Sequence, residues 1–205
     1  MIQFLETIRL ADGVLQQLDL HQQRVDRTLK AHYGTRINLS RIKIPHACHK
    51  GVYKCRVVYD TEIREIDFQP YTLRPRKMVK VVNGDDIDYP YKYADRTPIN
   101  TLWYGTQADD VIILKNGLLT DSAYANIILQ NNDGLFTPTR PLLCGTMRQH
   151  LLDEQAILTK DIDATQLSDY QYIHFVNAMQ PLGCQPPMAV KDLVCLLYTS
   201  DAADD

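Results

Sequence analysis

The chain has 205 residues, of which 45% are hydrophobic and 23% are charged, a composition typical of a globular protein rather than a disordered one. Its 22 basic and 25 acidic residues give a net charge of -3 and are spread along the chain, which excludes a dedicated nucleic-acid binder. The uncharged apolar runs, such as VIIL at 111–114, are far shorter than the roughly 20 residues that a membrane span needs.

The first part of the chain predicts a small unit of strands around one helix. Apolar and polar residues alternate on both sides of Asp12-Gly13, which indicates a hairpin with a type I′ turn. The spacing over residues 20–33 predicts a helix that ends at Gly34. The two-residue period of VYKCRVVYD and EIREIDFQPY predicts two strands, and KMVKVV continues the pattern. We therefore expect an N-terminal α/β lobe over residues 1–85.

The polar turn at residues 83–86 precedes a larger region of mixed structure. A helical stretch is expected at 100–106, and Asn116-Gly117 predicts a hairpin between strands at 110–115 and 118–120. Further strands are expected at 126–130 and 135–138, and Gly145 leads into a helix over about 147–155. The fold class predicted is α+β, with a C-terminal lobe over residues 86–194.

The last eleven residues are unrelated in sequence character to the rest of the chain. Residues 195–205 read CLLYTSDAADD, which resembles an in-frame translation of a transposase-type sequencing adapter. Such segments are excluded from fold reasoning. We expect residues 195–205 to be a sequencing artefact and the native chain to end after Val194; the alternative is a genuine acidic tail.

The remaining features of the sequence favour a cytoplasmic protein without a metal site. The start, MIQFLETIRLADG, has no basic region followed by an apolar stretch and a cleavage site, so we expect no secretory signal. The five cysteines form no CxxC pair, which indicates free and mostly buried thiols. HACHK at 46–50 lacks a second pair of ligands and is interpreted as a surface cluster.

Several segments together resemble one enzyme family in order and spacing. They are FLETIR at 4–9, LHQQR at 20–24, YKYADR at 91–96, VIILKNGLLTDSAYANIIL at 111–129 and TPTRPLLCGTMR at 137–148. These segments resemble the class IV aminotransferases, the fold-type IV enzymes that use pyridoxal 5′-phosphate. The resemblance implies the two-lobed fold of the D-amino-acid aminotransferases, this cofactor, a small-molecule amino substrate and a homodimer.

The resemblance also implies the two central residues of the site. Lys92 in YKYADR matches the lysine that holds the cofactor covalently and moves the proton, which requires an unprotonated amine. Asp121 in LLTDSAYAN matches the acid that pairs with the pyridine nitrogen, where many members have glutamate. Without the family, Lys92 would be interpreted as a surface cation and Asp121 as a strand-end cap.

Other matched positions imply contacts to the cofactor. Arg24 corresponds to the arginine that binds the phosphate, where a guanidinium offers a rigid charged fork. Thr146 and the backbone of Met147 would complete the phosphate site at the start of a helix. Arg96 would approach the ring hydroxyl or the substrate carboxylate, and Asn177 in FVNAMQP would lie near the cofactor. Three further expectations are that Asn126 holds the hairpin, that Arg148 is an ion-pair partner, and that Arg9 faces either the pocket or solvent.

The reaction remains open between two alternatives within the family, because the shared cofactor chemistry serves both. The segment Lys-x-x-Asp-Arg is similar to the Lys-x-x-Asn-Arg of 4-amino-4-deoxychorismate lyases, and GTMRQ resembles their turn. A lyase of this kind removes pyruvate and releases 4-aminobenzoate for folate synthesis. The alternative is an amino-acid transaminase, branched-chain or D-specific. A non-catalytic relative with a binding role is a third hypothesis, against which Lys92, Asp121 and Arg24 argue together.

Overall fold

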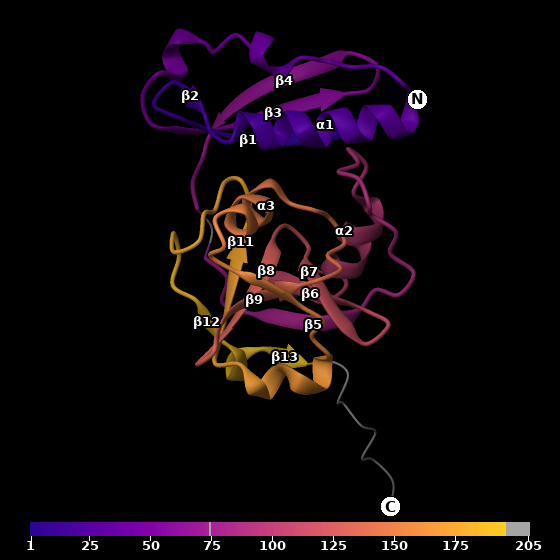
Figure 1. Ribbon diagram of the computed structural model, residues 1–205, viewed down its shortest axis with the longest axis vertical. Coiled ribbons are helices and arrows are strands. Elements are labelled where there is room, and N and C mark those ends of the chain that lie inside the picture. The colour runs from indigo at the N-terminus through magenta and orange to yellow at the C-terminus, as the bar shows by residue number, and fades with distance from the viewer. Residues whose placement is uncertain (74, 196–205) are drawn as a thin grey trace, which may run out of the picture.

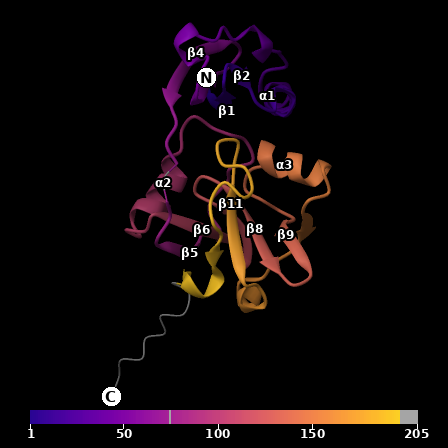
Figure 2. The same cartoon turned by 90° about the vertical axis from the view of Figure 1, so that its left-hand side faces the viewer.

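The computed structural model describes residues 1–73 and 75–195, which form two β-sheets joined by the segment after β4 (Figures 1 and 2). The first sheet is antiparallel, with the strand order β2-β1-β3-β4. Its elements are β1 (Phe4–Ala11), β2 (Val14–Leu15), α1 (Leu18–His32), the 3-10 helices Leu39–Arg41 and His46–Cys48, β3 (Val52–Tyr59) and β4 (Ile63–Pro70).

The local sequence signals of the first sheet are confirmed. Asp12 and Gly13 both have positive φ, 47° and 80°, which is the type I′ geometry expected between β1 and β2. The chain leaves α1 at Tyr33 and Gly34, whose N–H groups both donate to the Leu29 carbonyl. Val25 and Leu29 of α1 are fully buried in one core cluster with Phe4 and Ile8. The helix therefore covers one face of the sheet.

The second sheet follows the order β10-β9-β8-β7-β6-β5-β13 in the described residues, and β11 pairs with both β8 and β12. The Asn116-Gly117 turn expected between β6 and β7 is confirmed, with φ of 52° and 77°. The elements are β5 (Val79–Asn83), α2 (Thr97–Tyr104), β6 (Asp110–Lys115), β7 (Leu118–Ser122), β8 (Asn126–Asn131), β9 (Gly134–Pro138), α3 (Thr146–Asp153), β10 (Leu158–Lys160), the 3-10 helix Ala164–Asp169, β11 (Tyr172–Val176), β12 (Met188–Ala189), the 3-10 helix Val190–Asp192 and β13 (Val194–Cys195).

One strand lies in a different sheet from the one expected. KMVKVV was predicted to continue the first unit, but β5 pairs in parallel with β6 and belongs to the second sheet. Val79 and Val81 are fully buried and Val82 nearly so, as is usual for a parallel strand covered on both faces. Alternation alone predicts a strand but does not say which sheet it joins, so this assignment is wrong.

The two sheets meet along β1 and the segment that contains Lys92. The Leu5 N–H donates to the Lys92 carbonyl at 2.8 Å, and the Ala94 N–H donates to the Gln3 carbonyl at 2.9 Å. The two sheets are also linked by their helices, because α1 contacts α3. Figure 2 shows α3 below α1, next to the second sheet. No described helix combines the length and the apolar character that crossing a bilayer needs. Residues 196–205 of the predicted adapter segment lie outside the described residues.

Candidate active site

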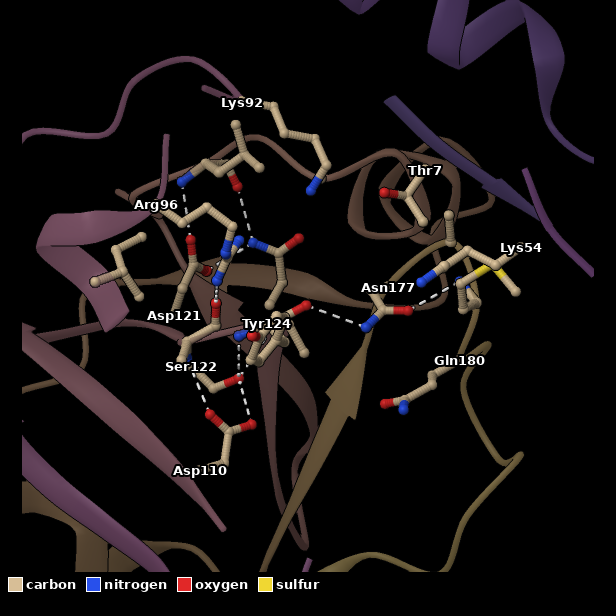
Figure 3. A pocket seen from close by; sticks show the side chains of 18 of the residues that line it. Thr7, Lys54, Lys92, Arg96, Asp110, Asp121, Ser122, Tyr124, Asn177 and Gln180 are labelled. Carbon is tan, nitrogen blue, oxygen red and sulfur yellow. Dashed lines mark hydrogen bonds between the residues drawn. The ribbon is translucent and has the colours of Figure 1, made fainter. Parts of the chain in front are cut away.

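A cavity of about 900 Å³ lies between the two sheets. β1, α1 and β3 contribute to its wall from the first sheet, and β7, the start of β8 and the segment before α3 contribute from the second. Figure 3 shows Lys92, Arg96 and Asp121 on one side of the cavity, and Lys54 and Asn177 on the other. Six of the seven residues expected to bind the cofactor line it: Arg24, Lys92, Arg96, Asp121, Thr146 and Asn177.

Lys92 is held between two aromatic neighbours. The rings of Tyr91 and Tyr93 lie with their centroids 6.3 and 5.5 Å from that of Phe4 in β1, so both neighbours are anchored on the first sheet. Burial, together with the positive charges of Arg24 and Arg96, lowers the pKa of the Lys92 amine to about 7, although the charge of Glu6 acts in the opposite direction. A large share of this amine is therefore unprotonated at neutral pH, as a nucleophile or a base requires.

Arg24 forms a buried ion pair with Glu6. Its Nε donates to Glu6 Oε1 at 2.8 Å and its Nη2 donates to Oε2 at 2.5 Å. His21 Nδ1 lies 2.6 Å from Oε2. Burial alone would raise the pKa of Glu6, but the charge and hydrogen bonds of Arg24, together with His21, hold that pKa at about 2. The carboxylate is thus ionised at neutral pH and fixes the guanidinium.

The start of α3 lies next to this ion pair. Thr146 Oγ1 is 3.5 Å from His21 Nε2, and Arg24 Nη1 donates to the Cys144 carbonyl at 3.5 Å. A Cβ on Gly145 would lie 1.9 Å from Asn126 Oδ1, so only glycine fits at this position. The close approach brings the N-terminus of α3, with its free N–H groups, beside Arg24, and this arrangement suits an anion such as phosphate.

Two side chains of α3, those of Met147 and Arg148, are not part of the cavity wall. The Met147 side chain packs in an apolar cluster with Ile128 and Leu151, so only its backbone could take part in a phosphate site, as expected. Arg148 donates to the Pro138 carbonyl at 2.9 Å and forms no ion pair with any described carboxylate. The prediction that Arg148 is an ion-pair partner is therefore wrong. The side chain is buried, and its acceptor is the backbone carbonyl at the end of β9 instead of a carboxylate.

Asp121 lies near the end of β7 as a buried carboxyl group. Asn126 Nδ2 donates to one of its oxygens at 2.6 Å, and the Leu143 N–H donates to the other at 2.8 Å. Burial raises the pKa of Asp121 to about 7, although these two donors and the charge of Arg148 act in the opposite direction. Asp121 can therefore either keep a proton or give it up near neutral pH. Asn126 holds the hairpin, as expected, and does so by fixing this carboxyl group.

Arg96 and Asn177 both hold the turn between β7 and β8. The Arg96 guanidinium donates to the Ala123 carbonyl and lies 4.3 Å from the centre of the Tyr124 ring, while its Nε is buried and has no hydrogen-bond partner among the described residues. Asn177 Nδ2 donates to the Tyr124 carbonyl at 3.1 Å. Arg9, left open by the sequence, donates to the Met179 carbonyl at 3.2 Å.

The residues that surround the cavity fit pyridoxal phosphate. The cofactor has a phosphate, an aldehyde and a ring nitrogen, and the cavity presents an anion site at Arg24 and Thr146, the amine of Lys92 and the carboxyl group of Asp121. The close approach at Gly145 and the unpartnered Arg96 Nε are both consistent with a polar group held in this space. An amine, an anion site and a buried acid around one cavity define a site of the pyridoxal phosphate class.

Two residues of the site were missed by sequence reasoning. Glu6 and His21 are both fully buried and fix Arg24 and the start of α3. The burial of Glu6 could have been predicted from the sequence, because side chains alternate along a strand and residue 6 shares its face with the core residues Phe4 and Ile8. A carboxylate on an apolar face requires a partner, and the adjacent helix contains Arg24.

Comparison with known proteins identifies the family. The class IV amino-transferase profile matches residues 91–184. An uncharacterized protein of Haemophilus influenzae is 35% identical over 188 residues, which cover 89% of this chain and all of that protein. The chain belongs to the class IV aminotransferase family and is a pyridoxal-phosphate-dependent enzyme.

Solved structures confirm the fold. The crystal structure of a candidate 4-amino-4-deoxychorismate lyase from Haemophilus somnus is 29% identical, with a TM-score of 0.78 over 89% of this chain and 98% of that chain. A hypothetical aminotransferase from Mycobacterium tuberculosis in its PLP-bound form is 17% identical, with a TM-score of 0.76 over 94% and 81% of the two chains. The predicted α+β fold of the fold-type IV enzymes is thus confirmed.

Proposed function

We propose that this enzyme is a 4-amino-4-deoxychorismate lyase, which eliminates pyruvate from its substrate and releases 4-aminobenzoate for folate synthesis. The observation that carries this choice is the similarity to the candidate lyase of Haemophilus somnus, which extends over 98% of that chain and exceeds 25% identity. The segment Lys92-x-x-Asp95-Arg96, which resembles that of the lyases, contributes two residues to the cavity wall and supports the same choice.

In this proposal Lys92 moves the proton. When bound, the cofactor supplies an aldehyde that takes up the substrate amine and a ring that accepts the electron pair left at the neighbouring carbon. The Nζ of Lys92, with its pKa near 7, removes the proton from that carbon. The same nitrogen then holds this proton within the cavity, where it can be returned to the departing three-carbon group.

Asp121 controls the charge of the ring nitrogen. A carboxylate in this position keeps a proton on that nitrogen, and Asn126 and the Leu143 N–H fix its two oxygens. Since aspartate is one methylene shorter than the glutamate of many relatives, the close packing between Asn126 and Gly145 has to bring Asp121 within reach.

The remaining residues orient the cofactor. We propose that Arg24, Thr146 and the backbone of Met147 bind the phosphate, with Glu6 holding Arg24 in place. Arg96 faces the ring hydroxyl or the substrate carboxylate, and Asn177 keeps the Tyr124 turn beside the ring.

Replacement of Lys92 tests this assignment. We expect Lys92→Ala to lose the visible absorption band of the lysine-bound cofactor and to release no pyruvate from 4-amino-4-deoxychorismate. Lys115→Ala is the control, because Lys115 lies at the end of β6, outside the cavity wall, and its Nζ donates to the Ile87 carbonyl. Persistence of both the band and the product in Lys92→Ala would refute the role of this lysine.

We further propose that the enzyme acts in the cytoplasm as a homodimer, as the family resemblance implies. Light scattering on the purified protein should give twice the chain mass of 23.5 kDa. A single chain mass at micromolar concentration would contradict the dimer.

A further inference from the structure

The cations on the cavity wall differ in whether a carboxylate already neutralises them. Arg24 pairs with Glu6, Arg56 Nη1 lies 3.1 Å from Glu65 Oε2, and Arg76 Nε lies 2.7 Å from Asp110 Oδ2. Among the described residues, the wall contains six cations: Arg24, Lys54, Arg56, Arg76, Lys92 and Arg96. Three of them thus already have a carboxylate partner, and Arg24 and Lys92 are both assigned to the cofactor.

Lys54 is a half-buried cation with no described carboxylate in contact. It lies in β3 opposite Arg9 of β1 and Gln69 of β4, so no acidic residue faces it across either strand pair. Figure 3 shows its side chain beside Thr7 and Asn177, on the side of the cavity away from Arg96. Removing an ammonium group from water without a counter-charge is unfavourable, which makes this position receptive to an anion.

Arg96 is the second cation of the wall that pairs with no described carboxylate. Its guanidinium binds the Ala123 carbonyl and covers the Tyr124 ring, and its Nε finds no hydrogen-bond partner in the part of the chain that the structure describes. Apart from Lys92, the described wall therefore has two cations without a carboxylate partner, and Figure 3 shows Arg96 and Lys54 on opposite sides of the cavity. A single ligand that pairs with both carries two separated negative charges.

We propose that Lys54 forms a carboxylate-binding subsite, so that the cavity selects amino substrates that carry a second carboxylate. This inference rests on the proposed function and makes Lys54 a specificity-determining residue for it. The proposed lyase substrate has two carboxylates, whereas branched-chain amino acids and D-alanine have one. Lys54 would bind the carboxylate farther from Arg96, through a charged hydrogen bond from its Nζ.

Ligand binding to the cofactor-loaded enzyme tests the subsite without turnover. Chorismate has the two carboxylates of the proposed substrate but a hydroxyl in place of the amine, and 4-aminobenzoate has one carboxylate. We expect calorimetry to show that Lys54→Met weakens chorismate binding by roughly 10- to 100-fold, as for the loss of one charged hydrogen bond. Binding of 4-aminobenzoate should change less than about twofold, and Lys54→Arg should retain most of the chorismate affinity.

Lys50→Met is the matched control, since it removes the same charge from an exposed residue two positions before β3 that does not line the cavity. It should leave both affinities unchanged. Unchanged chorismate binding in Lys54→Met, or an equal loss for both ligands, would overturn the subsite. In case Lys54→Met folds poorly, Lys54→Gln provides the same comparison with a polar side chain.

The test separates the subsite from the proposed reaction. Chorismate binding that depends on Lys54 in an enzyme that releases no pyruvate would support the subsite and overturn the lyase. Pyruvate release with a Michaelis constant that Lys54→Met does not change would support the lyase and overturn the subsite. If both proposals hold, Lys54→Met should raise that constant by roughly 10-fold or more and leave the turnover number largely unchanged.

Discussion

Glu6 and Arg24 form an ion pair with two hydrogen bonds, of 2.8 and 2.5 Å, between a strand and a helix in the interior of the first sheet. Glu6 is fully buried and Arg24 nearly so. Such a pair is strongly directional, since each carboxylate oxygen accepts from a different nitrogen of the guanidinium. The ion pair therefore fixes the orientation of the Arg24 guanidinium, whose remaining nitrogen, Nη1, donates to the Cys144 carbonyl just before α3.

Replacing Glu6 should affect both stability and the cofactor. Glu6→Gln leaves the Arg24 charge buried without its partner, which costs about 3–5 kcal/mol of unfolding free energy. It should also weaken cofactor binding, because Arg24 loses its orientation. Urea unfolding and cofactor titration measure the two effects. Glu65→Gln, which breaks the exposed pair with Arg56, should cost less than about 1 kcal/mol, and equal losses in the two variants would contradict the role of Glu6.

The same ion pair predicts how stability depends on acid. The pKa of Glu6 is about 2 in the folded protein, below its ordinary value of 4.5, so the unfolded chain binds more protons between these values. The contribution of Glu6 to the free energy of unfolding is therefore complete above about pH 4.5 and is lost as the pH falls toward 2. Urea unfolding at several pH values should show a steeper loss in this range for the wild type than for Glu6→Gln. Parallel curves would contradict the low pKa of Glu6.

Lys92 should capture the cofactor at a lower pH than an ordinary lysine. Only the neutral amine attacks an aldehyde, and burial together with the charges of Arg24 and Arg96 lowers the pKa of Lys92 from 10.5 to about 7. The rate at which the absorption band appears on mixing with pyridoxal phosphate should rise with pH and reach half of its maximum near pH 7. A midpoint above pH 9 would show that the amine is not desolvated.

Some features of this fold follow from local sequence, and others depend on the assembled structure. Asn116-Gly117 predicts its turn because two positive φ angles are a local property. The sheet in which β5 pairs depends on the distant strand β6. The resemblance predicted that Arg24 lies at the cofactor site, but its neutralisation by Glu6 arises only once α1 packs on β1. Likewise, Lys54 is recognisable as uncompensated only when the neighbours of β3 are known.

Gly145 should tolerate no side chain. In Gly145→Ala the new Cβ would lie 1.9 Å from Asn126 Oδ1, which forces Asn126 away and breaks its hydrogen bond to Asp121. We expect a loss of about 1–3 kcal/mol in unfolding free energy and weaker cofactor binding. Gly105→Ala is the control: its Cβ meets Thr101 O at 3.6 Å, an ordinary contact, and the free energy should stay unchanged or rise by up to about 1 kcal/mol. Similar affinities for the cofactor in both variants would contradict the proposed packing around Asp121.

The reaction proposed for this cavity is the elimination of pyruvate. The most direct measurement follows pyruvate and 4-aminobenzoate together, with the cofactor spectrum, after 4-amino-4-deoxychorismate is added to the loaded enzyme. We predict that both products appear in equal amounts over many turnovers and that the cofactor keeps its aldehyde oxidation state. Conversion of the cofactor to its amine form by amino acids, with no pyruvate released from 4-amino-4-deoxychorismate, would contradict the lyase and identify a transaminase.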